Sequence, residues 1–233
     1  MKLNSSIPPM GYLSLLANVL KNIGKGIGLL FILSMAVVIT VGSLKHFSPY
    51  TTPSTFLKTK QIHYSIYLPA LYGHIVTSGC ILVIGGLGFS RWIQTNAIQW
   101  HRRMGKAYVG LILFISAPSA LIMAFYARGG WLINSCFFAL SFLWWLFTWQ
   151  AWMYIRKKNI LQHRAFMLRS YALTLSAITL RWYTFFLGYL FNWYNLNSYT
   201  WVAWFSWVPN LIIVEYWIWA NIKKKIKPTN NAS

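Results

Sequence analysis

The sequence predicts an all-α protein, a polytopic bundle of about six transmembrane helices. Of its 233 residues, 57% are hydrophobic and only 9% are charged, whereas a soluble domain has about 25% charged residues. Five stretches without Lys, Arg, Asp or Glu are long enough to cross a bilayer, which takes about 20 residues. The cations are concentrated between these stretches, as expected for loops at a membrane surface.

We expect six spans because the last of these stretches contains a polar break, Asn192–Thr200, that no membrane helix would include. The expected spans are 26–44, 65–89, 106–126, 131–154, 167–190 and 201–222. Residues 26–222 would then form a single transmembrane domain between a tail at 1–25 and a basic tail at 223–233.

The first span has no ionisable residue, so we place it at the periphery of the bundle. Before it, Met10–Leu20 is apolar but too short to cross, and an interfacial helix is the alternative. After it, the segment 45–64 holds His46 and His63 and reads as an irregular external loop.

The second span contains His74, and Thr77, Ser78 and Gly85 continue its face at helical spacing. Small residues on that face allow close helix approach. Two interpretations of His74 remain open: a structural histidine bonded to a neighbouring helix, or a ligand or proton-relay group.

A loop from 89 to 106 leads to the third span, in which Pro118 predicts a kink. A tight turn at Arg128–Gly130 then leads to the fourth span. Four tryptophans near the expected cytoplasmic end of that span suit an aromatic belt; they are Trp144, Trp145, Trp149 and Trp152.

The fifth span carries a polar stripe, in which Ser170, Thr174, Ala177, Arg181 and Thr184 recur at steps of four and three. That spacing puts them on one face of a continuous helix. A cation inside a span costs about 2.5–3.5 kcal/mol on insertion scales. We therefore expect Arg181 to face the bundle, at the level of His74.

The sixth span contains Asn210 beside Pro209, and the only acidic residue, Glu215, nearer the cytoplasm. At about 1.5 Å per residue, Arg181 lies roughly 20 Å from the cytoplasmic end of its helix and Glu215 roughly 10 Å. We therefore expect Glu215 to pair with Arg169 or a histidine rather than with Arg181. With Thr174 and Asn210, these two residues form the predicted polar core, which either ties helices together or has a functional role.

The distribution of cations predicts the topology, because cytoplasmic loops are enriched in Lys and Arg. Sixteen fall on one side and four on the other, which places both termini in the cytoplasm. The four are Lys45, Lys58, Lys60 and Arg128. A net charge of +20 arranged in this way fits a bilayer with anionic headgroups and not nucleic acid.

Two short motifs indicate an internal repeat. His101-Arg102 precedes the third span and His163-Arg164 precedes the fifth, 62 residues later. Spans two–three and four–five would then be parallel hairpins. His101 and His163 begin these helices at the same level, so their imidazoles can approach a common point if the two helices are neighbours across a four-helix core. The alternative is that both His-Arg pairs lie at the headgroup boundary and only set the depth of their helices.

Three longer segments resemble known sequences: HRRMGKAY, HRAFMLRSYALTLSAITLR and WVPNLIIVE. Together they resemble an uncharacterised bacterial family of predicted multi-pass inner-membrane proteins, over roughly residues 65–220. The likeness implies a bacterial inner-membrane location and no activity. More remotely, histidines at helix ends in a four-helix core are similar to cytochrome b561-type bundles. That likeness implies haem b, although such bundles use two histidine pairs and the outer side here offers His74 alone within a span.

Several kinds of chemistry are excluded by composition, because the chain has no Asp and a single Glu. Carboxylate pairs, Ser/His/Asp triads and carboxylate magnesium sites are impossible. The two cysteines, Cys80 and Cys136, are expected to be buried free thiols.

Three hypotheses remain. The first is a haem- or quinone-linked electron-transfer protein with His101, His163 and His74 as candidate ligands, which implies a membrane redox partner. The second is a small proton-coupled transporter that uses the polar core. The third is a membrane scaffold or assembly factor without chemistry of its own.

Overall fold

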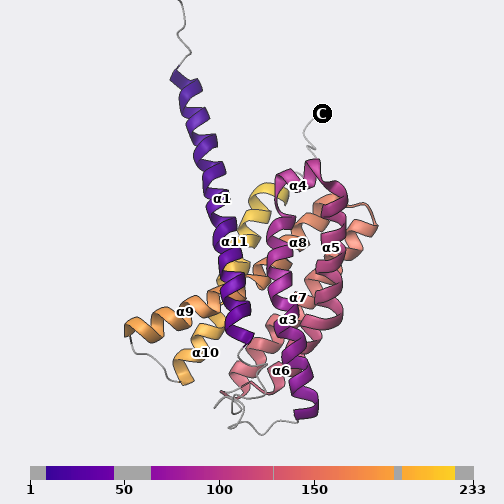
Figure 1. Ribbon diagram of the computed structural model, residues 1–233, viewed down its shortest axis with the longest axis vertical. Helices are drawn as coiled ribbons and strands as arrows, with labels where there is room; N and C mark the ends of the chain where they lie inside the picture. The colour runs from indigo at the N-terminus through magenta and orange to yellow at the C-terminus, as the bar shows by residue number, and fades with distance from the viewer. Residues whose placement is uncertain (1–8, 45–63, 128, 192–195, 224–233) are drawn as a thin grey trace, which may run out of the picture.

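A computed structural model describes residues 9–44, 64–127, 129–191 and 196–223, and every regular element within them is helical (Figure 1). The predicted all-α class is therefore confirmed. The external loop with His46 and His63, Arg128 and the end of the basic tail lie outside the described residues. The elements are α1 Pro9–Leu44, α3 Tyr64–Gly88, α4 Arg91–Asn96, α5 Ile98–Leu111, η2 Ile112–Ser116, α6 Ala117–Phe125, α7 Trp131–Arg156, α8 Ile160–Thr174, α9 Ser176–Phe191, α10 Leu196–Phe205, α11 Val208–Ile218 and η3 Trp219–Lys223.

Three helices are long and apolar enough to cross a membrane: Ser65–Gly88, Ile98–Phe125 and Trp131–Arg156. A shorter apolar segment, Gly26–Gly42, lies within α1. We expected six continuous spans. The fifth and sixth are not continuous, because each is broken into two shorter helices.

The core lies between α3, the continuous α5–η2–α6 rod, α7 and α8. Helix α7 packs along α8 and α6, while α3 packs along α5 and α6. α1 packs on the outside of α3, α9 projects away from the bundle, and α10 packs against α9 and α7 (Figure 1). The largest buried cluster joins these core helices to the α10–α11 junction and includes Ile81, Tyr108, Cys136, Trp144 and Trp207.

Helix α1 is one unbroken helix of 36 residues. At about 1.5 Å per residue it is about 54 Å long, well beyond the roughly 30 Å of a hydrocarbon core. The apolar segment Met10–Leu20 is therefore the continuation of the first span and not a separate helix, so no structural boundary separates the predicted tail from that span at residue 25.

The third span begins earlier than expected, at Ile98, because most of the predicted loop is helical. The helical structure is interrupted at Phe89–Ser90, between α3 and α4, and again at Ala97, between α4 and α5. The irregularity predicted from Pro118 takes the form of the π-helical turn Ile112–Ser116, directly before α6. Pro118 offers no N–H to the carbonyl four residues earlier, and a wider turn there lets the rod continue.

The turn predicted before the fourth span is confirmed at its two glycines. Gly129 and Gly130 have φ values of 118° and 78°, a region that favours glycine. A Cβ on Gly129 would also lie 2.0 Å from Cδ1 of Ile133, so a larger residue would have no room.

The fifth span breaks at Leu175, between α8 and α9. Two side chains donate hydrogen bonds to backbone carbonyl oxygens near the break. The hydroxyl of Thr179 donates to the carbonyl of Leu175, and Nδ2 of Asn210 in α11 lies 3.4 Å from the carbonyl oxygen of Ala172. The sixth span breaks between α10 and α11, at Ser206–Trp207, because Pro209 cannot donate within a helix and is confined to its first turn.

Candidate functional site

The register of α5 and α8 places His101 and His163 at one level. Both helices run in the same direction, and Tyr108 Oη lies 3.0 Å from Ser170 Oγ. Each of these residues stands seven positions after the histidine of its own helix, about 10 Å along the axis. The 62-residue offset between the two histidines is thus also the offset between Tyr108 on α5 and Ser170 on α8, which face each other. We call His101 and His163 the histidine pair.

The two imidazoles of the histidine pair differ in their hydrogen bonding. Nδ1 of His163 lies 2.8 Å from the carbonyl oxygen of Ala151, so it is the protonated nitrogen and Nε2 carries the lone pair. Nδ1 of His101 is buried and has no hydrogen-bond partner among the described residues. A buried polar nitrogen in this state calls for a water, ion or ligand.

Space is available beside His101. Gly105 stands one turn later on the same face of α5, and a Cβ built there would meet nothing within 4 Å. Arg102 and Arg164, next to the two histidines, are both exposed. Arg164 lies over the ring of Trp217, 5.5 Å from its centroid.

Beyond the histidine pair, five buried residues join α5, α7 and α8 through a network that we call the hydroxyl ring: Tyr108, Trp144, Thr148, Ser170 and Thr174. Oγ1 of Thr174 accepts from Nε1 of Trp144 at 3.0 Å and lies 3.0 Å from Tyr108 Oη. Oγ of Ser170 lies 2.7 Å from Oγ1 of Thr148, whose hydroxyl donates to the Trp144 carbonyl at 2.7 Å.

The Thr174 hydroxyl also donates to the Ser170 carbonyl of its own helix at 3.1 Å. Contacts lead from the indole N–H of Trp144 through Thr174, Tyr108, Ser170 and Thr148 to the carbonyl of Trp144. Because the ring closes on itself, the arrangement ties three helices together. Thr174 is therefore a buried polar residue, as expected, with a role in helix packing.

His74 bonds to a neighbouring helix. Its Nδ1 lies 3.1 Å from the carbonyl oxygen of Ser116, at the end of the π-turn. Its ring also meets Trp144 edge-on, with centroids 6.5 Å apart. Ser116 stands 15 residues after His101, about 22 Å along the rod, so His74 does not join the histidine pair. The structural interpretation of His74 accounts for these contacts.

Arg181 bonds to its own helix, and its place in the polar core stays a prediction. Its side chain is exposed, and its guanidinium donates to the carbonyl of Ala177 in its own helix at 2.9 Å. The polar stripe faces the core from Ser170 to Thr174. The break at Leu175 then turns α9 away from the bundle.

Glu215 pairs with Arg169, one of the two partners that helix depth predicted. Nη2 of Arg169 donates to Oε2 at 2.9 Å, and Nε contacts Oε1, so the pair is bidentate. The guanidinium also lies over the ring of Phe166, 4.6 Å from its centroid. This ion pair joins α8 to α11.

Asn210 lies close to both helix breaks. Its Nδ2 is 2.9 Å from Oγ1 of Thr179 and 3.1 Å from the carbonyl oxygen of Ser206. It thus links α11 to α9 and to the junction with α10, as a residue that ties helices together.

The two cysteine thiols, Cys80 and Cys136, differ in burial. Cys136 is buried, as expected, and its sulfur accepts from Nε1 of Trp207 at 3.3 Å. The expectation for Cys80 is wrong, because it is exposed on α3.

Sequence reasoning missed the two tyrosines at the centre of the bundle, Tyr108 and Tyr171. Extending the 62-residue comparison by seven positions beyond the histidines would have found Tyr108 opposite Ser170. The hydroxyl of Tyr171 donates to the carbonyl of Leu82 at 3.1 Å. A Cβ on Gly85 would lie only 2.4 Å from the Tyr171 ring and 2.8 Å from that of Tyr108.

Within the described residues, no group of three or more His, Cys, Asp or Glu side chains could hold a metal ion. Axial ligation of a haem requires only two facing imidazoles, so the histidine pair meets that requirement by residue type.

Comparison with known sequences gives one family. The model of a family described as "Predicted membrane protein (DUF2306)" matches residues 71–218. No curated protein and no solved structure matches the chain.

Proposed function

The chain belongs to the family of predicted membrane proteins DUF2306, and on that premise we propose that it is a haem-binding electron-transfer protein of the bacterial inner membrane. His101 and His163 would be the axial ligands of one haem b at the cytoplasmic end of the bundle. One observation carries the proposal: the register set by Tyr108 and Ser170 holds the two imidazoles at one level on different helices.

The residues present fit such a group. The hydrogen bond from Nδ1 of His163 to Ala151 leaves Nε2 as the coordinating atom and fixes the ring, as is usual for metal-ligating histidines. His101 would supply the second imidazole, although its Nδ1, unlike that of His163, has no hydrogen-bond partner among the described residues. Arg102 and Arg164 would be the cations available to the haem propionates, or to lipid phosphates. A bound haem b would supply a one-electron redox centre.

The proposal does not extend to electron transfer across the whole membrane. His74 stands about 22 Å further along the bundle, and its Nδ1 is engaged by Ser116. A second histidine pair at that level is not found among the described residues. A single redox centre near the cytoplasmic face suits exchange of electrons with a membrane partner on that side.

The transporter hypothesis is less well supported. The hydroxyl ring closes on Trp144, so its donors are used to hold α5, α7 and α8 and do not lead towards either surface. Arg181, the cation expected along a transport path, is exposed.

The test is the visible spectrum of protein purified after expression with ample haem. We expect a Soret band in the wild type and its loss in His101→Ala and in His163→Ala. The matched control is His74→Ala, which removes the third histidine of the bundle and should retain the band. Circular dichroism and gel filtration would show that each variant is folded. A colourless wild type, or haem loss in His74→Ala alone, would overturn the proposal.

A further inference from the structure

The short helix α4 and the first turns of α5, residues 91–106, lie at one end of the bundle and form a bend that we call the elbow (Figure 1). The helical structure is interrupted at Ala97, and α4 contributes no buried residue. The side chain of Gln94 donates to the carbonyl of Gly88, at the end of α3, at 2.9 Å. The elbow thus has a defined position against α3, although the side chains of α4 lie outside the core.

The outward face of α5 carries Trp100, Arg103 and Lys106 at steps of three residues. Each residue turns about 100° around a helix axis, so Trp100 stands about 160° away from Tyr108. Tyr108 is 1% exposed and marks the inward face, whereas Trp100 is 61% exposed. Arg103 and Lys106 are exposed as well. This face of α5 therefore points away from the other helices of the bundle.

Cations and aromatic rings lie together on this surface. The guanidinium of Arg103 lies over the ring of Trp100, 5.9 Å from its centroid, which is a cation–π contact. Arg91 and Trp92 on α4 add another exposed cation and another exposed ring. Tryptophan beside Lys or Arg is typical of the membrane–water interface, where the ring lies among the headgroups and the long cationic side chain reaches their phosphates.

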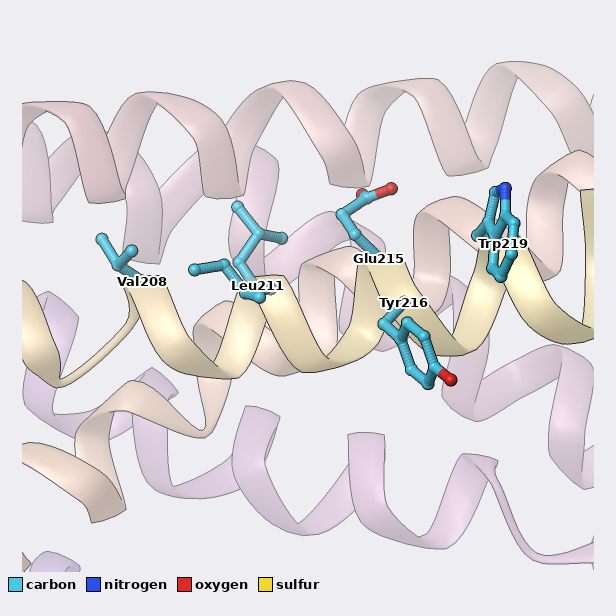
Figure 2. A pocket seen from close by; sticks show the side chains of 6 residues that line it. Val208, Leu211, Glu215, Tyr216 and Trp219 are labelled. Carbon is cyan, nitrogen blue, oxygen red and sulfur yellow. The ribbon is translucent and has the colours of Figure 1, made fainter.

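The side chains of the protein leave the cations of the elbow without a counter-charge. The sequence has a single acidic residue, Glu215, which projects from α11 (Figure 2). Arg169 binds its carboxylate with two nitrogens. Arg91, Arg103 and Lys106 therefore carry a positive charge that an anionic surface would balance. Each cation close to an anionic membrane strengthens binding about fivefold.

We propose that the elbow binds the headgroups of anionic phospholipids, with Arg91, Arg103 and Lys106 on the phosphates and Trp92 and Trp100 inserted between the headgroups. A zwitterionic headgroup binds more weakly, because its own cation offsets its phosphate. A soluble acidic partner would match the charges but gain nothing from two large exposed rings. The combination of rings and cations thus favours a lipid surface.

Lipid binding at the elbow is independent of the proposed function, because it uses the outward face of α5. The imidazole of His101 belongs to the inward side, where its Nδ1 is buried. The elbow and the histidine pair can therefore be tested separately on the same protein.

The experiment is native mass spectrometry of the full-length protein released from detergent micelles, which gives a Kd for each added lipid. We expect the wild type to bind dioleoylphosphatidylglycerol about tenfold or more tightly than dioleoylphosphatidylcholine. A variant that combines Arg91→Gln, Arg103→Gln and Lys106→Gln should bind phosphatidylglycerol about tenfold or more weakly than the wild type, and its preference over phosphatidylcholine should disappear.

The matched control removes the same number of exposed cations at the end of α7, by Arg156→Gln, Lys157→Gln and Lys158→Gln. The two variants have equal net charge, so a difference between them reports the elbow and not the total charge. We expect the control to change the Kd by less than about threefold. Circular dichroism and gel filtration show that both are folded, and the single variants Arg103→Gln and Arg156→Gln carry the same comparison if a triple variant is not.

A second pair of variants tests the rings. Trp100→Ala should weaken phosphatidylglycerol binding about fivefold, whereas Trp131→Ala, at the start of α7 and 77% exposed, should change it by less than about twofold. Affinity that depends on the cations and not on Trp100 would indicate a soluble acidic partner and overturn the proposal. So would displacement of the lipid by glycerol 3-phosphate or by polyglutamate, equal affinities for the two lipids, or equal losses in the two triple variants.

The two proposals fail separately. The lipid titration is repeated on the double variant His101→Ala, His163→Ala, which should bind phosphatidylglycerol as the wild type does. Preference for phosphatidylglycerol in a protein without a Soret band would end the haem proposal and keep this one. A Soret band together with equal affinities for the two lipids would end this proposal and keep the other.

Discussion

At the scale of single residues, two tyrosine rings determine that position 85 must be glycine. A Cβ there would lie 2.4 Å from the ring of Tyr171 and 2.8 Å from that of Tyr108. Both tyrosines are buried and hydrogen-bonded, so neither ring can move aside without breaking a contact between helices.

We predict that Gly85→Ala lowers the stability of the folded bundle by about 1–3 kcal/mol, as overpacking of a core does. The matched control is Gly110→Ala on α5, where a Cβ meets nothing within 4 Å and should be neutral or slightly stabilising. Thermal unfolding in detergent, followed by circular dichroism, measures both. Equal melting temperatures for the two variants would contradict the prediction.

The hydroxyl ring leads to a second prediction at this scale. Tyr108→Phe removes the hydroxyl that bridges Ser170 and Thr174. We expect a loss of about 0.6–1.7 kcal/mol, the range measured for hydrogen bonds between membrane helices. Tyr216→Phe is the control, because Tyr216 is 70% exposed. The same thermal unfolding assay compares them, and a Tyr108→Phe melting temperature equal to that of the control would show that the ring contributes nothing.

The sequence allowed some single-residue contacts to be predicted and hid others. The depths of Arg181 and Glu215 along their helices argued against a pair between them and named Arg169 as a possible partner of Glu215. These depths could be estimated from the sequence because they depend only on the rise per residue. The orientation of Arg181 could not be predicted, because it depends on a break at Leu175 that has neither Pro nor Gly to announce it.

At the scale of elements, irregular turns decide which helices remain in the bundle. The π-turn at Ile112–Ser116 keeps α5 and α6 in one rod and brings the Ser116 carbonyl to His74. The break at Leu175 instead turns α9 away from α8. Pro118 and Pro209 signalled two of the irregularities, whereas the third is stabilised by Thr179 and Asn210, which are distant in sequence.

The ion pair between α8 and α11 gives a prediction about these elements. Arg169→Gln or Glu215→Gln alone leaves one charge without its partner, and each should cost about 1–3 kcal/mol. This is below the 3–5 kcal/mol of a fully buried pair, because Glu215 is 41% exposed. The double variant should cost less than the sum of the two, since no charge is then left alone.

Chemical or thermal unfolding of the four proteins closes this double-mutant cycle. Additive losses would mean that Arg169 and Glu215 act independently, and the contact would then have no part in holding α11 to α8.

At the scale of the whole molecule, a strongly apolar composition and a helical period were sufficient to predict the class. They were not sufficient to predict continuity. α8–α9 and α10–α11 each have enough apolar residues for one span, yet each is divided into helices of 10–16 residues. The apolar composition of a segment predicts that it can lie in a membrane or a protein core. Whether the segment forms one continuous helix depends on its tertiary contacts.

The arrangement of these broken helices bears on the last prediction, the topology. In Figure 1 the start of α1, the short α4 and the end of α11 lie towards one end of the molecule, and the α9–α10 hairpin lies away from it. The asymmetry of sixteen cations against four assigns that end to the cytoplasm. We therefore expect both termini inside and the segment between α9 and α10 outside.

Single cysteines introduced into a Cys80→Ser, Cys136→Ser background measure this with a membrane-impermeant maleimide on intact cells. Asn192→Cys, after α9, should be labelled, whereas Ser233→Cys should be labelled only after the membrane is opened. Arg103→Cys on α5 is the control for the inner side, because its side chain is exposed near the histidine pair. Labelling of Asn192→Cys and Ser233→Cys from the same side would mean that α10–α11 does not return across the membrane.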